Sequence, residues 1–453
     1  MEVAVISVES IKPSSPVHHL KPFKLCLLDQ LTPASYSPLI LFYPTNDAHL
    51  KSTQILTQLK WTLSKTLTPF YPLSGRVKDN FVIHNYEEGV PFIEARVKGH
   101  LSDFLQHPQM ELLNQFLPCQ SFCQQPNPTV AQAAVQVNMF DCGGFALGMC
   151  FSHKINDGIT GSSFIKSWAA NARGSANEAI HPNLSDASSL FPPQESLPSH
   201  YTSLMESLWF SKRRFRTRRF VFDANAVATL SAKGRSKLIQ SPTRVEGLCA
   251  FIWRSCMNAC RSISGSTRPS VMSQAVNIRR LTKPRLSRYS IGNLVWSAIA
   301  SYDPDETEMR MQELVALVRE GVGRINSEYL KKLSGEGCTA IYEHLNRLAE
   351  MASENPDVFS FFSWHTFDFS EIDFGWGKPI WVGIFGKARR DSPCDSNFII
   401  LKDIGKNNGI EAWMTLDENI MAILEHDLEF LAFASLNPCI VMETNKVFCS
   451  LEE

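Results

Sequence analysis

The stretch CFSHKINDG, residues 150–158, decides how this chain is interpreted, because it places a histidine and an aspartate four positions apart after an apolar run. Residues 145–152 are apolar enough for a central strand, and residues 133–140 alternate apolar and polar as a half-buried strand does. The DCGG segment between them favours a turn, so the sequence predicts a β-hairpin. We therefore expect His153 where a strand gives way to a loop and a helix, a place from which side chains commonly face a cleft.

The helix after His153 is predicted from apolar residues at helical spacing. These residues are Ile159, Phe164, Ile165, Trp168, Ala169 and Ala172. Both motif residues have a structural alternative at this stage. Asp157 precedes Gly158 at a helix start, where aspartate is a favoured N-cap, and a histidine at a strand end is often satisfied by backbone groups. The HxxxD spacing alone leaves these alternatives open, since the chain has 12 histidines.

The composition is that of an ordinary globular protein and excludes several classes of function. The chain has 453 residues, 44% hydrophobic and 20% charged, which predicts two or three domains. A formal net charge of -1 gives no global field to recruit nucleic acid or an anionic membrane. No basic segment leads into an apolar one at the N-terminus, and no 18-residue apolar run follows, so neither secretion nor membrane spanning is expected.

The 12 cysteines predict neither a disulfide scaffold nor a zinc site. The tightest pairs are Cys119/Cys123 and Cys256/Cys260, and no CxxC occurs, whereas structural zinc needs four ligands at workable spacing. In a chain of this length, reduced thiols are the expected state, which makes the cytosol the default compartment.

Strands and helices are mixed in both halves of the chain, which predicts an α/β or α+β fold in two domains. Residues 174–200 are rich in Ser, Pro and Asn and are interpreted as a surface linker. The predicted boundaries are an N-terminal domain at 1–180, a linker at 181–215 and a C-terminal domain at 216–453.

Several elements are predicted in the C-terminal half. A helix is expected from the Asp303 cap and Pro304, with Leu314, Val318, Val322, Ile325 and Tyr329 on one apolar stripe. Near the end of the chain, residues 397–403 and 410–416 are predicted strands joined by a Gly-Lys-Asn-Asn-Gly turn, and a helix is expected from about Asp417.

The segment DFGWGKP, 373–379, differs from the rest in its local chemistry. Two glycines flank Trp376, and Asp373 leads the turn. Glycine allows a backbone path closed to other residues, and aspartate hydrogen-bonds the turn that it starts, so this segment predicts a rigid loop.

Taken together, these stretches resemble the plant BAHD acyltransferase family. HKINDG at 153–158 and DFGWG at 373–377 resemble the two signature motifs, the first weakly specific and the second strongly so. Further family stretches match PFYPLSGRV at 69–77, TRVEGLCAFIWR at 243–254, VNIRR at 276–280 and the opening HHLKPFKLCLLDQL. The resemblance spans essentially the whole chain. It is strongest to the branch that acetylates alkaloids and other specialised metabolites.

The resemblance implies two similar αβ domains of the chloramphenicol-acetyltransferase-like fold, with mixed β-sheets and an interdomain channel open at both faces. Acyl-coenzyme A is expected from one side and the acceptor from the other, with His153 in mid-channel. Asp157 is expected to point away from the substrates toward Arg279. The DFGWG residues Asp373, Gly375, Trp376 and Gly377 are carried over as structural support.

The chemistry implied by the resemblance is direct acyl transfer with histidine as general base. An alcohol is a poor nucleophile at neutral pH, and imidazole is the side chain whose ordinary pKa suits removal of its proton. Coenzyme A already supplies an activated acyl group, so no acyl-enzyme is needed. A Ser-His-Asp hydrolase is the competing mechanism, but the chain has no GxSxG.

The substrate contacts are predicted less directly. Thr243 and Arg244 are expected near the coenzyme, whereas the basic stretch 211–219 is interpreted mainly as a solvated strand or linker. In relatives of this family, alternate residues of the strand SPLILFY face the acceptor. Here these are Ser37, Leu39 and Leu41, and a core role for the two leucines is an equal alternative.

The sequence thus predicts a cytoplasmic, monomeric, metal-free O-acyltransferase that uses acetyl-coenzyme A as co-substrate and holds no permanent cofactor. An alkaloid or terpenoid alcohol is the expected acceptor, with neither nucleic acid nor membrane as a partner. The alternatives are a longer or aromatic acyl donor, an amine acceptor, or a non-catalytic ligand-binding relative. A nucleic-acid binder using residues 211–219 lacks a recognition motif.

Overall fold

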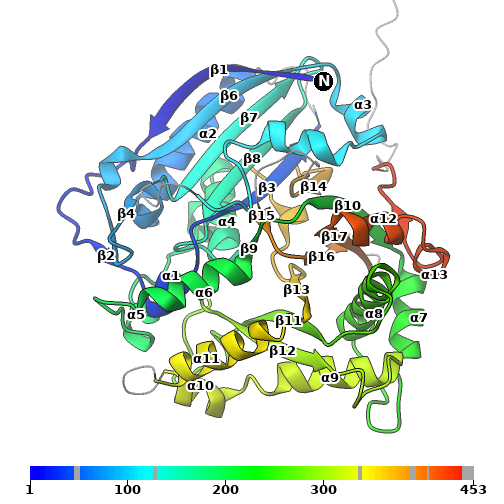
Figure 1. The fold of residues 1–453 in the computed structure, drawn as a ribbon. Coiled ribbons are helices and arrows are strands. Elements are labelled where there is room, and N and C mark those ends of the chain that lie inside the picture. Colours follow the sequence, from blue (N-terminus) through cyan, green and yellow to red (C-terminus); the bar gives the residue numbers. More distant parts are fainter. Residues whose placement is uncertain (45–51, 126–129, 335–338, 387–393, 406–407, 441–453) are drawn as a thin grey trace, which may run out of the picture.

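Two large mixed β-sheets and the helices packed on them form the molecule (Figure 1). The computed structural model describes residues 1–44, 52–125, 130–334, 339–386, 394–405 and 408–440. The expected α/β class with mixed sheets is confirmed. Two smaller sheets complete the topology, one of β2 (Phe23–Lys24), β5 (Val82–His84) and β4 (Arg76–Lys78), the other of β9 (Phe210–Ser211) and β15 (Cys394–Asp395).

The first large sheet carries the predicted hairpin at its centre. Its strand order is β1 (Glu2–Ile11), β6 (Val90–Lys98), β7 (Ala133–Phe140), β8 (Phe145–Ser152), β3 (Tyr36–Tyr43) and β14 (Trp381–Gly383). Strands β7 and β8 pair antiparallel, which confirms the hairpin, whereas β6 and β7 are parallel. Helices α2 (Ser52–Leu67) and α4 (Gly158–Ala172) share a hydrophobic core with one face of this sheet.

Strand β8 is buried on both faces, because each face packs against a different core. Its alternate residues Phe145, Leu147, Met149 and Phe151 point to the core with α2 and α4. On the other face, the 3₁₀ segment Met110–Phe116 approaches so closely that a Cβ on Gly148 would lie 1.9 Å from the Phe116 carbonyl oxygen. Glycine is therefore required at 148 for this packing.

The second large sheet is built almost entirely from the C-terminal half. Its strand order is β12 (Val295–Tyr302), β11 (Ser270–Asn277), β13 (Asp357–Ser363), β16 (Phe398–Ile404), β17 (Gly409–Asp417), β10 (Phe215–Phe222) and β18 (Ser435–Leu436). The predicted strands near the end of the chain are β16 and β17, although residues 406–407 of their turn lie outside the described residues. One hydrophobic core joins this sheet to its helices, seen at the lower right of Figure 1. These helices are α7 (Ala224–Lys233), α8 (Arg244–Ser264), α9 (Met311–Gly323), α12 (Glu418–Leu424) and α13 (Leu428–Leu431).

The two large sheets are joined by a shared aromatic core. Trp381 of β14 stacks on Phe42 of β3, with ring centroids 5.1 Å apart, and on Trp413 of β17, at 5.8 Å. Phe398 and Ile400 of β16 belong to the same cluster, and α3 (Leu101–Gln106) contributes Phe104. Because β14 comes from residues 381–383 and pairs with β3, a segment of the C-terminal half completes the first sheet. The predicted domain boundaries stay a prediction.

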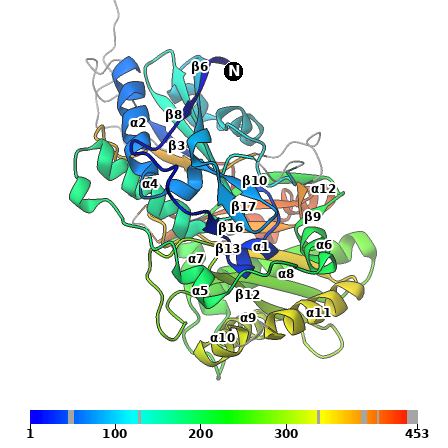
Figure 2. The same ribbon diagram turned by 90° about the vertical axis from the view of Figure 1, so that its left-hand side faces the viewer.

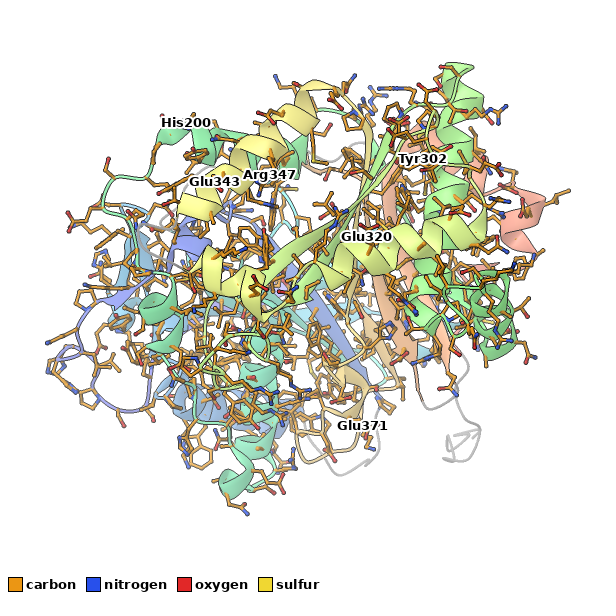
Figure 3. The ribbon with its side chains drawn as sticks, turned by 90° about the horizontal axis from the view of Figure 1, so that it is seen from below. His200, Tyr302, Glu320, Glu343, Arg347 and Glu371 are labelled. Carbon is orange, nitrogen blue, oxygen red and sulfur yellow. The ribbon has the colours of Figure 1, made fainter. Side chains whose placement is uncertain are left out.

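A fourth core underlies β12 and is built from short helices. It contains α1 (Leu27–Leu31), α5 (Asp186–Leu190), α6 (Ser199–Trp209), α10 (Ser327–Leu333) and α11 (Thr339–Ser353), which are spread across the lower half of Figure 2. Seen from below, α11 with Glu343 and Arg347 lies beside His200 of α6 (Figure 3). Tyr201 and Tyr342 stack between these helices with ring centroids 4.9 Å apart.

Two sequence predictions need correction here. The helix expected from Asp303 begins only at Met311, because Asp303 closes a turn by accepting a hydrogen bond from Asp305 N at 2.9 Å. It also ends at Gly323, and Asn326 caps a separate helix, α10, by accepting from two backbone N–H groups. The stretch 174–200 is not a plain surface linker, since Phe191 is fully buried in the fourth core. Among the described residues, no helix is both long and apolar enough to cross a membrane.

Candidate active site

His153 lies at the end of β8, directly before the loop that leads into α4, as the sequence predicts. Its main chain is held on both sides. His153 N donates to the Ser35 carbonyl oxygen at 2.8 Å, and Asn293 Nδ2 donates to the His153 carbonyl oxygen at 2.5 Å. The residue as a whole is half-buried. The imidazole therefore projects from a fixed backbone and is not sealed inside the core.

The surroundings of the imidazole favour its neutral form. Burial lowers the pKa of His153 below its ordinary value, and the side chains of Asn293 and Asp157 offset this only in part. Within the described part of the chain, Nδ1 is buried and makes no hydrogen bond. The half-buried indole of Trp209 meets the ring edge-on, with centroids 5.2 Å apart. A neutral imidazole at neutral pH can accept a proton, which is what a general base must do.

Asp157 and Arg279 form a buried ion pair. Arg279 Nη1 donates to Asp157 Oδ2 at 2.6 Å, and Nη2 donates to Oδ1 at 3.1 Å. Asp157 also caps α4 by accepting from Thr160 N at 2.8 Å, and it accepts from Leu294 N at 3.2 Å. The N-cap expectation for Asp157 is therefore confirmed. Since both carboxylate oxygens are engaged in these bonds, the carboxylate is suited to fixing the loop and does not relay a proton.

Arg279 in turn ties this loop to the segment before β12. It donates to the carbonyl oxygens of Ser290, at 3.1 and 2.8 Å, and Gly292, at 3.1 Å. The next residue, Asn293, reaches His153, and its N and Nδ2 both donate to Asp29 Oδ1, at 2.7 and 3.0 Å. The residues around the base thus come from four separate stretches of chain.

At the start of α4, a second close approach fixes the same loop. A Cβ on Gly158 would lie 2.2 Å from the ring of Phe367. Glycine after Asp157 therefore lets the segment following β13 pack against the helix N-terminus.

The DFGWG loop lies at the opposite end of α4 from His153. Asp373 Oδ1 accepts from Gly375 N at 2.7 Å and from Gly377 N at 2.9 Å, and both glycines have positive φ, +110° and +100°. Arg173, which follows α4, donates to the Asp373 carbonyl oxygen at 2.9 Å. Trp376 packs among aromatic rings that include Phe374, at 5.7 Å between centroids. A 15-residue helix is about 22 Å long, so this loop is remote from the base.

The predicted coenzyme contacts, Thr243 and Arg244, start helix α8. The Thr243 hydroxyl accepts from Glu246 N at 3.2 Å, as part of a capping box. Arg244 Nη1 donates to the Asn408 carbonyl oxygen at 3.1 Å and lies 3.4 Å from Asp403 Oδ1. Both have roles within the protein, and their contact with a coenzyme stays a prediction.

Four arginines of the basic stretch 211–219 are engaged in ion pairs. Arg214 lies 3.9 Å from Glu418 of α12, and Arg216 and Arg218 both pair with Glu425, directly after this helix. Arg219 is buried and lies 2.9 Å from Glu411. Residues 215–219 therefore lie in a charged strand, as predicted, but Arg219 is buried and not solvated.

The predicted acceptor contacts on β3 are placed mainly in the core. Leu39 and Leu41 are 2% and 0% exposed and belong to the core with α2 and α4, whereas Ser37 is half-buried. The structure therefore favours the core alternative for the two leucines, because their side chains point away from the second sheet and toward these helices. Three residues near the base, Trp209, Asn293 and Asp29, were not predicted from the sequence. The only signal for them in the sequence is that they stand in apolar or turn-like segments.

The described residues hold no cluster of three or more His, Cys, Asp or Glu side chains that could bind a metal ion. Nine cysteines in this part of the chain are free thiols, Cys26 and Cys256 among them buried.

Comparison with known proteins agrees with this geometry. Residues 1–431 match the model of the Transferase family. Epi-neemfruitin B 7-O-acetyltransferase of Melia azedarach is 42% identical, over 97% of this chain and 99% of that protein. Limonoid 7-O-acetyltransferase of Citrus sinensis is 40% identical, with the same coverage. The crystal structure of vinorine synthase superposes with a TM-score of 0.81 at 31% identity, covering 96% of this chain and 99% of that one. The chain therefore belongs to this family, the BAHD acyltransferases, as its two motifs indicate.

Proposed function

We propose that this enzyme transfers the acetyl group of acetyl-coenzyme A to a hydroxyl group of a terpenoid or alkaloid specialised metabolite. The observation that carries the proposal is His153, a half-buried imidazole whose pKa is lowered by burial and whose backbone is held on both sides. Relatives at 40% and 42% identity are named as O-acetyltransferases, which supports acetyl as the group transferred and a hydroxyl as the acceptor.

The reaction needs one group that accepts and returns a proton. His153 Nδ1 is buried, which leaves Nε2 to take the proton of the acceptor hydroxyl as its oxygen attacks the thioester carbonyl carbon. The tetrahedral intermediate collapses when the C–S bond breaks, and the imidazolium returns the proton to the departing thiolate. The products are the acetyl ester and free coenzyme A. A general base of this kind contributes about 10²–10⁴-fold to the rate.

Trp209 provides the apolar surface beside the base. Its indole is half-buried and touches the edge of the His153 ring, and its carbonyl oxygen accepts from Ser396 N at 3.0 Å. A ring of this size favours a flat or fused-ring acceptor by apolar contact, with the hydroxyl directed to the imidazole.

A cytoplasmic location and a monomeric state belong to the same proposal. The nine free thiols of the described residues fit a reducing compartment, where disulfides are rare. Fractionation of the source tissue and gel filtration of the purified protein test these two points.

The decisive experiment is an assay of free thiol release. The purified protein is incubated with acetyl-coenzyme A and a panel of limonoid and alkaloid alcohols, and the ester product is identified by mass spectrometry. We expect thiol release that depends on the acceptor and falls at least about a hundredfold in His153→Ala. Release without acceptor would indicate a thioesterase. Transfer from longer acyl-coenzymes A alone would replace acetyl as the donor, and binding without transfer by any donor would refute the proposal.

A further inference from the structure

The residue after the base, Lys154, is the one buried lysine among the residues that the structure describes. It is 5% exposed, and its ammonium group donates to three main-chain carbonyl oxygens. These belong to Asp29 at 2.7 Å, Gln30 at 3.2 Å and Thr32 at 2.6 Å. All three lie at or just beyond the C-terminal end of the five-residue helix α1. Two of them have a second donor, since Asp29 O also accepts from Thr32 N at 3.2 Å and Gln30 O from Asn80 Nδ2 at 3.0 Å, so the ammonium group binds carbonyl groups that are already fixed.

The same short piece of chain contacts His153 by two other routes. Ser35, three residues beyond Thr32, accepts the His153 N–H. The Asp29 carboxylate holds Asn293, which donates to the His153 carbonyl oxygen. We call residues 29–35 the anchor segment. The anchor segment thus holds the His153 backbone at two points, because Ser35 accepts the His153 N–H and Asp29 acts through Asn293 on the His153 carbonyl oxygen. It also binds the side chain of the next residue, Lys154.

Of these three links, the one through Lys154 carries a positive charge. Burial lowers the pKa of Lys154 to about 8, although the nearby acidic groups of Asp29, Cys26 and Glu206 act in the opposite direction. Asp29 and Cys26 lie on or beside α1, and Glu206 lies on α6. Three carbonyl acceptors in a fixed arrangement use all three ammonium protons, so loss of one proton removes one link.

We propose that Lys154 is a positioning residue for His153, whose ammonium group locks the catalytic loop onto the anchor segment. The inference rests on the proposed function, since it assigns how the base of that reaction is held. Lys154 touches neither reacting atom. It fixes the position and orientation of the imidazole relative to the acceptor hydroxyl. Its loss should therefore lower kcat and leave substrate binding unchanged.

The test compares Lys154→Met, which keeps the length and removes the donors, with Lys154→Arg, which keeps a charge and donors. Lys166→Met is the matched control, because Lys166 lies on the following helix and pairs at the surface with Asp368. We expect kcat at least about tenfold lower in Lys154→Met, since misplacement by about 1 Å can cost on the order of 100-fold. KM for both substrates is expected to stay within about twofold, because ground-state binding is not altered. Lys166→Met is expected to match the parent, and Lys154→Arg to regain part of the lost turnover.

The dependence of kcat on pH separates positioning from folding. In the parent, kcat is expected to fall above about pH 8 as Lys154 loses its proton, and in Lys154→Arg the fall should move to higher pH. Because the pKa of Lys154 is lower in the folded state than in the unfolded state, this group makes the free energy of unfolding rise as the pH rises above about 8. An alkaline fall in kcat without a fall in melting temperature therefore reports the position of the base.

Three results would overturn the inference. They are a kcat for Lys154→Met within twofold of the parent, equal losses of kcat and thermal stability in both Lys154 variants, or identical pH profiles for the parent and Lys154→Arg. If Lys154→Met does not fold, the last comparison decides. Parent protein that transfers no acetyl group would refute the proposed function instead, so the two failures are distinguishable.

Discussion

Replacement of Arg279 by methionine is expected to destabilise the fold before it alters the chemistry. The Arg279 and Asp157 side chains are 1% and 3% exposed, and two hydrogen bonds join them. In Arg279→Met, the Asp157 carboxylate keeps only the N–H groups of Thr160 and Leu294. A buried charge left without its partner costs about 3–5 kcal/mol, so the free energy of unfolding should fall by that amount.

Two further variants make this magnitude testable. Asp157→Asn combined with Arg279→Met removes both charges, and we expect it to regain at least about 1 kcal/mol relative to Arg279→Met alone, as coupled neighbours do. Arg324→Met makes the same substitution at an exposed ion pair, 2.6 Å from Glu320 on α9, where we expect a change of no more than about 0.5 kcal/mol.

The assay is urea unfolding followed by tryptophan fluorescence, combined with kcat per folded molecule in the absence of urea. We expect the unfolding midpoint of Arg279→Met to fall while kcat per folded molecule declines less than in His153→Ala. An unchanged unfolding curve with turnover as low as in His153→Ala would refute this reasoning, because the ion pair would then act on the reaction itself.

Three other predictions concern the base, its aromatic neighbour and the sheet beneath it. Because burial lowers the pKa of His153 and the base must be unprotonated, kcat/KM measured against pH should rise through a midpoint below the ordinary pKa of histidine. Trp209→Ala should raise the KM for the acceptor and leave that for acetyl-coenzyme A unchanged in initial-rate measurements; equal effects on both would contradict its place beside the acceptor. Gly148→Ala should lower the free energy of unfolding by about 1–3 kcal/mol in urea titrations, because its Cβ would meet the Phe116 carbonyl oxygen at 1.9 Å.

The sequence predicts those parts of the site that depend on local chemistry. The hairpin before His153 follows from alternation and a turn, and Asp157 is a recognisable helix cap. Arg279 was assigned through the family resemblance, and the ion pair is present. By contrast, Asp29 lies 264 positions from Asn293, so nothing local marks their contact. Lys154 stands inside the quoted motif, yet its burial depends on carbonyl groups more than 120 positions earlier.

The errors in the predicted elements have the same origin. The apolar stripe from Leu314 to Tyr329 fits one helix, but the side chain of Asn326 bonds the backbone N–H groups of Glu328 and Tyr329 and starts a new one. The cap at Asn326 therefore ends the first helix, although the apolar periodicity in the sequence continues through this residue. In the stretch 174–200, Phe191 packs in a core with residues of α1 and α6. This burial depends on segments outside most of the stretch, so the pattern of residues within it does not predict it.

The placement of Trp209 explains how the acceptor could change while the motif stays the same. Trp209 ends α6, within the predicted linker 181–215, and β9 directly after it pairs with β15. This pairing and the bond from Ser396 fix the indole against the His153 ring without any contact to Asp157 or Arg279. The base is therefore held from one side by the anchor segment and the buried ion pair, and is faced from the other by Trp209, whose backbone is fixed by Ser396. Because the rest of α6 packs against α1, only substitutions at Trp209 and in β9 are expected to reshape the acceptor surface without disturbing the anchor segment, so differences in acceptor between relatives are expected to concentrate there.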